Sequence, residues 1–178
     1  MKHGEKGYTL IELAIAITIM ALASSAAGGA IFQILRDTQR NNDHITAVRQ
    51  VQNAGYWISR DAQMAETATT DLTLPDFLIL SWTEWDDAGD PISHSATYSF
   101  EELTDGIGKL KRSHLSSAGV NEQTLIAEYI YYDSNDIDDT SQASYESPVL
   151  TVQLTALFEK TLETREYRIK HRVQTFDQ

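Results

Sequence analysis

The chain has 178 residues, no cysteine and a formal net charge of −12. Without cysteine, the chain forms neither disulfide bonds nor thiolate metal sites. The charge is unevenly distributed: residues 1–66 carry six basic and six acidic groups, whereas residues 67–178 carry 8 basic and 20 acidic groups. Because an acidic domain repels phosphate backbones, we expect no nucleic-acid partner, and the imbalance indicates two regions with different roles.

A long apolar segment near the N-terminus extends from Tyr8 to Leu35, and Glu12 is its only charged side chain. As a helix, these residues would span roughly 42 Å, which exceeds the ~30 Å hydrocarbon core of a bilayer. Lys2 and Lys6 precede the segment and favour a cytoplasmic N-terminus. The segment therefore predicts a single crossing of the cytoplasmic membrane, with the following domain outside the cytoplasm.

Two simple interpretations of this segment leave Glu12 without a role. An ordinary secretory signal would use "ALASS" at 21–25 as a cleavage site, but the apolar character continues well past that site. A plain single-pass anchor would have to accept a carboxylate, and a charge at the centre of the bilayer costs ~2.5–3.5 kcal/mol on insertion scales.

A third interpretation rests on the stretch "GYTLIEL" at residues 7–13, which follows a short charged leader. This stretch resembles the class III signal of type IV pilins and type II secretion pseudopilins, and the similarity covers residues 1–35. The resemblance implies that a prepilin peptidase removes residues 1–7 by cutting between Gly7 and Tyr8. It also implies that the new amine of Tyr8 is methylated and that Glu12 occupies the position of the family's acid.

Cleavage would give Glu12 an electrostatic partner. In a filament, the carboxylate of one subunit can pair with the amine of Tyr8 in its neighbour, and the pairing offsets the desolvation of both charges. Such a pair would favour stacking of subunits and set their axial register.

The small residues at 21–30 include Gly28 and Gly29, each of which lowers helix propensity by ~1 kcal/mol relative to alanine. These glycines either loosen the helix during assembly or permit close packing of helices, and the sequence leaves both interpretations open.

An amphipathic pattern follows Leu35. Apolar or small residues recur at spacings of three and four, at Ile45, Val48, Val51, Gly55, Ile58, Ala62 and Ala65. The charged residues of this region, including Asp61, fall at other positions. We predict one helix from about residue 8 to about residue 66, with residues 8–35 as its transmembrane and filament-core part and residues 36–66 packed on a head domain.

Residues 67–178 form the predicted head domain. A loop at 67–76 precedes strands predicted at 77–85, 92–100, 108–115, 125–133, 149–159 and 165–175, with a turn at 86–91 and a polar loop at 134–148. A long helix packed on an antiparallel β-sheet is an α+β arrangement, and it matches the pilin-like fold that the resemblance implies. The order of strands also resembles that of minor pseudopilins of the J type and of large minor pilins.

Few residues in the head indicate chemistry. The acidic stretches 86–90 and 133–139 offer oxygen ligands for calcium, but 133–139 lacks the glycine and glutamate of an EF-hand, so solvated loops are the preferred interpretation. The five histidines have no zinc-binding spacing; His94 and His114 could be neighbours on adjacent strands, and we expect them at the surface. No nucleophile or nucleotide-binding pattern is recognisable, so we predict no enzyme and no cofactor, with calcium at an acidic stretch as the alternative.

The sequence thus predicts a minor pilin or pseudopilin of a type II secretion or type IV pilus-like filament. Its location would be the cytoplasmic membrane and then a periplasmic or cell-surface filament. The implied partners are a prepilin peptidase, other pilins or pseudopilins, an inner-membrane assembly platform and, in a secretion system, secreted cargo. The alternative is a membrane-tethered extracytoplasmic binding module that does not polymerise.

Overall fold

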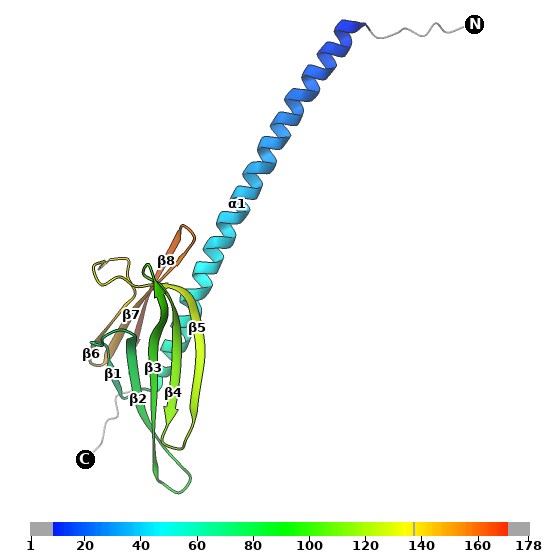
Figure 1. Cartoon of the computed structure of the whole chain (residues 1–178). Helices are drawn as coiled ribbons and strands as arrows, with labels where there is room; N and C mark the ends of the chain where they lie inside the picture. The colour runs from blue at the N-terminus through cyan, green and yellow to red at the C-terminus, as the bar shows by residue number, and fades with distance from the viewer. Residues whose placement is uncertain (1–8, 137, 171–178) are drawn as a thin grey trace. The chain divides into compact units, whose positions relative to one another are not determined.

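The structure, a computed structural model, describes residues 9–136 and 138–170. It consists of one long helix, α1 (Leu10–Met64), followed by a β-sheet (Figure 1). The strands are β1 (Thr67–Thr69), β2 (Asp76–Trp85), β3 (Pro91–Thr104), β4 (Ile107–Ser116), β5 (Asn121–Tyr131), β6 (Gln142–Glu146), β7 (Val149–Phe158) and β8 (Thr161–Lys170). The predicted α+β class and the predicted helix are therefore confirmed.

The sheet is antiparallel throughout and has the strand order β1-β2-β3-β4-β5-β7-β6, with β8 paired to β7. On β7, Gln153 pairs with both β6 and β8, whereas Ala156 pairs with β5 and β8. Strand β8 therefore lies along one side of β7, while β6 and β5 share the other side. The sheet is curled, as Figure 1 shows.

The chain divides into two compact units, residues 1–42 and residues 43–178, so α1 belongs to both. The buried residues of α1 all lie in the second unit, at Ala47, Val51, Ala54, Gly55, Ile58, Asp61 and Ala62. The alanine, valine and isoleucine side chains among them form one hydrophobic core with the sheet, and the largest members of that core include Leu78, Leu80, Tyr98, Leu110, Ile130 and Leu154. The second unit therefore contains a complete core of its own.

Small residues on α1 allow the sheet to approach closely. Gly55 lies against the ring of Tyr167 on β8, where an added Cβ would overlap the ring. The Tyr167 hydroxyl donates a hydrogen bond to the Val51 carbonyl oxygen at 3.0 Å. The predicted apolar stripe of the amphipathic half is thus a packing surface, and Gly55 is part of it because no side chain fits there.

Two strands differ from the sequence-based prediction. Strand β1 lies in the predicted loop 67–76, and β6 lies in the predicted polar loop 134–148. Both are short edge segments rich in polar or small residues, so they lack the apolar signal of a buried strand. The predicted strand at 165–175 is seen as β8 up to Lys170, and its remainder lies outside the described residues.

Candidate functional site

The first part of α1 is apolar and has no buried side chain. Helix α1 contains a window of mean hydropathy 2.0, long and apolar enough to cross a membrane, and none of that window is buried. Large apolar residues with most of their surface exposed include Leu10, Ile11, Met20, Leu22, Phe32 and Ile34. Because water would not stabilise such a surface, this part of the helix is suited to lipid or to contacts with other helices.

Glu12 caps the start of α1. One carboxylate oxygen of Glu12 accepts hydrogen bonds from the backbone N–H of Thr9 at 2.9 Å and from the Thr9 hydroxyl at 2.8 Å. The Glu12 N–H in turn donates to the Thr9 hydroxyl oxygen at 3.4 Å. This is a capping box, and its sequence signal is the T-x-x-E pattern ahead of an apolar run, a local role for Glu12 that the sequence-based prediction did not include. Glu12 thus has a local partner even in a single subunit.

The structure does not test the predicted roles of the other assembly residues. Gly7 and Tyr8, the predicted cleavage and methylation positions, lie outside the described residues. Gly28 and Gly29 lie within the uninterrupted helix α1, and an added Cβ at either would meet nothing within 4 Å. The space around them leaves both of their predicted roles open.

A buried ion pair joins α1 to the sheet. Asp61 is completely buried, and its carboxylate accepts hydrogen bonds from Arg112 Nε on β4 at 2.6 Å and from Arg112 Nη2 at 3.0 Å. The Tyr98 hydroxyl on β3 donates to the same carboxylate at 2.6 Å. The ring of Trp57 covers the guanidinium, with 5.1 Å from its centroid to Arg112 Cζ. Every oxygen of the carboxylate therefore has a partner.

The electrostatics of this group favour the charged pair. Burial raises the pKa of Tyr98, and the negative charge of Asp61 raises it further. Burial alone would lower the pKa of Arg112, but the hydrogen bond and the charge of Asp61 outweigh burial, so the pKa is raised. The arrangement has no open position for a substrate, and we interpret it as the clamp that orients α1 on the sheet.

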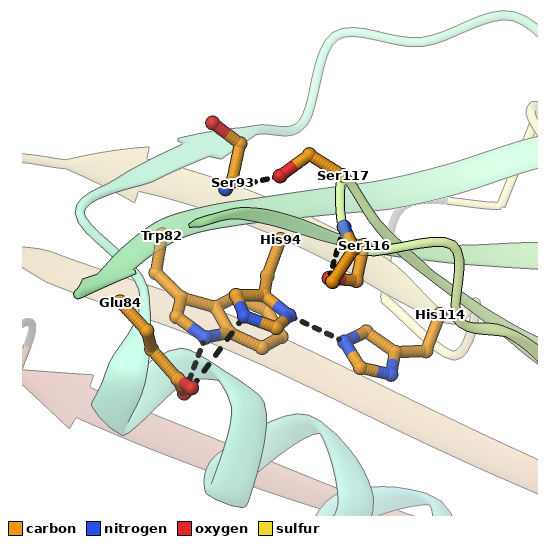
Figure 2. A network of polar contacts seen from close by, with 8 residues as sticks. Trp82, Glu84, Ser93, His94, His114, Ser116 and Ser117 are labelled. Atoms are coloured by element: carbon orange, nitrogen blue, oxygen red, sulfur yellow. Dashed lines mark hydrogen bonds and ion pairs between the residues drawn. The ribbon is translucent and has the colours of Figure 1, made fainter. Parts of the chain in front are cut away.

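A second polar cluster lies near the β2–β3 hairpin, on strands β2, β3 and β4. The rings of Trp82, His94 and His114 are nearly parallel, with centroids 5.3–5.5 Å apart. Figure 2 shows the His94 and His114 rings joined through Nδ1 and Nε2, which are 3.2 Å apart. The prediction that these histidines are neighbours on adjacent strands is confirmed, but the expected surface position of His94 is wrong, since its side chain is only 12% exposed.

Glu84 completes this cluster. Its carboxylate accepts a hydrogen bond from Trp82 Nε1 at 3.1 Å and lies 3.5 Å from His94 Nε2 (Figure 2). Burial lowers the pKa of His114, and the nearby positive charge of Arg112 lowers it further. The cluster contains no nucleophile and no oxyanion site.

In the two acidic loops, aspartate carboxylates accept hydrogen bonds from backbone N–H groups of the same loop. Asp133 Oδ1 accepts from the backbone of Asn135 at 2.9 Å, and Asp86 Oδ1 accepts from Ala88 and Asp90 at 2.9 and 2.8 Å. Ile137, inside the stretch 133–139, lies outside the described residues. Across residues 9–136 and 138–170, no group of three or more histidine, aspartate or glutamate side chains is placed to hold a metal.

A hollow of about 440 Å³ lies at the surface beside the second cluster. Its lining is rich in hydroxyl groups, from Thr67, Ser81, Thr83, Ser93, Ser95 and Ser117. These side chains can donate and accept hydrogen bonds, and Glu66 adds an acidic side chain to the lining.

Comparison with known sequences identifies one feature. The family described as the prokaryotic N-terminal methylation motif matches residues 2–28. No curated protein and no solved structure matches the chain. The matched residues contain the predicted class III signal and the start of the apolar helix, so the match supports the resemblance of this N-terminus to those of pilins and pseudopilins.

Proposed function

We propose that this chain, which has the prokaryotic N-terminal methylation motif and a pilin-like α+β fold, is a subunit of a type II secretion or type IV pilus-like filament. The observation that carries the proposal is the motif itself, in which Glu12 follows Gly7 by five residues and lies in the first turn of an exposed apolar helix. A prepilin peptidase would remove residues 1–7 and methylate Tyr8. Before assembly, the chain would be anchored in the cytoplasmic membrane with its head domain outside the cytoplasm.

Assembly would exchange one partner of Glu12 for another. In the single subunit the carboxylate accepts two hydrogen bonds from Thr9. In the filament it would receive the cationic amine of Tyr8 from a neighbour, which adds the attraction of a full positive charge to the hydrogen bond. Because the same carboxylate would otherwise be surrounded by apolar helices, the exchange favours the assembled state.

We place the chain among minor subunits, because its order of strands resembles that of J-type minor pseudopilins and large minor pilins. The function would then be mechanical and associative: α1 would stack in the filament core, and the head would contact other subunits, the assembly platform or cargo. Nothing in the described residues indicates catalysis, and the family is structural.

The alternative is a membrane-tethered binding module that never polymerises. The hydroxyl-lined hollow of about 440 Å³ is the observation in its favour, because such a hollow is large enough for a small polar ligand. In this case Glu12 would serve only as the cap of α1, and neighbouring subunits would not depend on its charge.

The test is a comparison of Glu12→Gln and Glu12→Leu with Asp37→Asn, which removes an exposed carboxylate from the same helix. In membranes with an active prepilin peptidase, intact mass should show the loss of residues 1–7 and the gain of one methyl in all three. Sheared filaments should contain the Asp37→Asn chain and lack both Glu12 variants. Glu12→Gln is informative because it preserves an acceptor for Thr9 and removes only the charge.

Two results would contradict the proposal. Recovery of only the full-length chain beside an active peptidase would exclude processing. Incorporation of Glu12→Gln at the wild-type level would show that the charge is not used in assembly. Absence of the wild-type chain itself from filaments would favour the tethered module.

A further inference from the structure

The face of α1 that points away from the sheet carries positive charge and an exposed aromatic ring. Ile45, Arg49, Tyr56 and Arg60 are spaced by four, seven and four residues, so they lie on one side of the helix, which we call the cationic face. Tyr56 is 61% exposed, and Trp57 supports Arg60, whose Cζ is 5.5 Å from the centre of the indole ring.

The charges of the cationic face are not used within the subunit. Arg49 and Arg60 are exposed and form no ion pair with any residue that the structure describes. The one acidic residue between positions 44 and 64 is Asp61, which is buried against the sheet. In a chain with a net charge of −12, an exposed face with two cations and no acid is a site of opposite potential.

A surface of the opposite sign lies at the turn between β2 and β3. It contains Trp85, which is 68% exposed, and the exposed carboxylates of Asp86, Asp87 and Asp90, and we call it the acidic tip. The Asp86 carboxylate accepts from the backbone of Ala88 and Asp90, and the Asp86 N–H donates to the Asp90 carbonyl at 3.0 Å. These contacts order the backbone of the turn that carries Trp85, Asp87 and Asp90.

The two surfaces are far apart within the second unit, because even Arg60, the charge of the cationic face closest to the tip, is next to Asp61. From Asp61, which bonds Tyr98, the acidic tip is reached along β3 at Pro91, seven residues or about 23 Å away. In the other direction, α1 passes along β5. The Asn53 side chain donates a hydrogen bond to the Ile126 carbonyl oxygen, and the Glu128 N–H donates to the Gln50 side chain. Arg49 lies twelve residues before Asp61, or about 18 Å along the helix.

One molecule therefore cannot bring its own tip to its own cationic face. We propose that the acidic tip of one copy of this chain docks on the cationic face of a second copy. The contact is heterologous, because each copy uses a different surface, and repeated heterologous contacts form an open helical assembly unless a ring closes. This inference rests on the proposed filament function and deepens it: the subunit would contact further copies of itself in the filament.

The chemistry of the two surfaces is suited to such a contact. Trp85 and Tyr56 are large rings that can bury apolar area at the centre, and aromatic residues and arginine dominate the energetics of interfaces. Arg49 and Arg60 would face Asp87 and Asp90 at the rim, where charges set orientation and the rate of association. Without this pairing, acidic heads in one filament would repel each other.

The chain contains no cysteine, so engineered pairs give crosslinks without background. Full-length Tyr56→Cys and Ala88→Cys chains, co-expressed with the assembly machinery, should form a disulfide-linked dimer that contains one copy of each. Neither variant alone should form it. A Gln123→Cys chain provides the control for Ala88→Cys, because this exposed residue on β5 belongs to neither surface.

Charge reversal tests the pairing itself. Arg49→Glu with Arg60→Glu in the Tyr56→Cys chain should lower the crosslink yield at least about tenfold. Asp87→Lys with Asp90→Lys in the Ala88→Cys chain should restore it to within about twofold, because the signs are exchanged and the capping carboxylate of Asp86 is retained. Raising the salt concentration should weaken the wild-type contact.

The outcomes separate this contact from filament function. If Glu12-dependent incorporation is intact but no mixed dimer forms, the contact is overturned and the filament proposal stands. If Tyr56→Cys crosslinks only to a different protein, a second copy is not the occupant and the contact is likewise overturned. If incorporation itself is independent of Glu12, the proposed function fails, whatever the crosslinks show.

Discussion

Removing the charge of Asp61 should destabilise the head more than any other single isosteric change. The side chain of Asp61 is 0% exposed and that of Arg112 is 7% exposed, and three hydrogen bonds of 2.6–3.0 Å join the carboxylate to Arg112 and Tyr98. Asp61→Asn places an NH2 group opposite a donor and leaves the guanidinium buried without a counter-charge. Loss of one partner of a buried pair costs about 3–5 kcal/mol, a large share of the about 5–15 kcal/mol that stabilises a domain.

Urea unfolding of residues 43–178, which contain the whole core, measures this cost. Asp43→Asn, on the same helix, should change stability by no more than about 0.5 kcal/mol. Combining Asp61→Leu with Arg112→Met and Tyr98→Phe should recover most of the loss, since apolar replacement of an entire buried pair is often neutral. A cost for Asp61→Asn below about 1 kcal/mol, the net worth of an ordinary hydrogen bond, or a triple variant weaker than the single one, would refute the clamp.

Two further predictions concern packing and protonation. Gly55→Ala should lower the melting temperature and break the hydrogen bond from the Tyr167 hydroxyl to Val51, because the new methyl overlaps the Tyr167 ring. Gly29→Ala, on the same helix, controls for the loss of a helical glycine, because its added Cβ meets nothing within 4 Å. Because the pKa of His114 is lower in the folded chain than in the unfolded chain, the unfolded chain takes up a proton at a higher pH. The contribution of His114 to the free energy of unfolding should therefore be complete above about pH 6.5 and should decline below it. His114→Gln should flatten that decline in melting temperature, measured from neutral to mildly acidic pH; an unchanged slope would contradict the assignment.

Local periodicity predicts the helix and most strands because their signals lie within a few residues. The spacing of Val51, Gly55, Ile58 and Ala62 places one side of α1 on the sheet, and that is where these residues are buried. The alternation in β3, with Ala96, Tyr98 and Phe100 buried, follows the same logic with a period of two.

The burial of Asp61 cannot be predicted from its neighbours in the sequence, because it depends on a distant partner. Arg112 follows it by 51 residues, and nothing near Asp61 in the sequence indicates the guanidinium. The pairing of His94 with His114 is predictable from adjacent strands, but the burial of His94 depends on Trp82, which stacks on both rings. The sequence alone therefore does not predict which distant polar groups pair. The Thr9–Glu12 cap, in contrast, is local, and its pattern is visible in the sequence.

The exposed and the buried parts of α1 should respond differently to substitution. Every buried residue of the helix lies at Ala47 or later, so the fold of the head does not depend on the side chains from Leu10 to Leu35. Those side chains are exposed and apolar, and only lipid or neighbouring helices can bury them. Substitutions there should therefore alter insertion and assembly while the head stays folded, whereas substitutions around Asp61 should do the reverse. One continuous helix would in this way serve two functions through side chains that hardly affect each other.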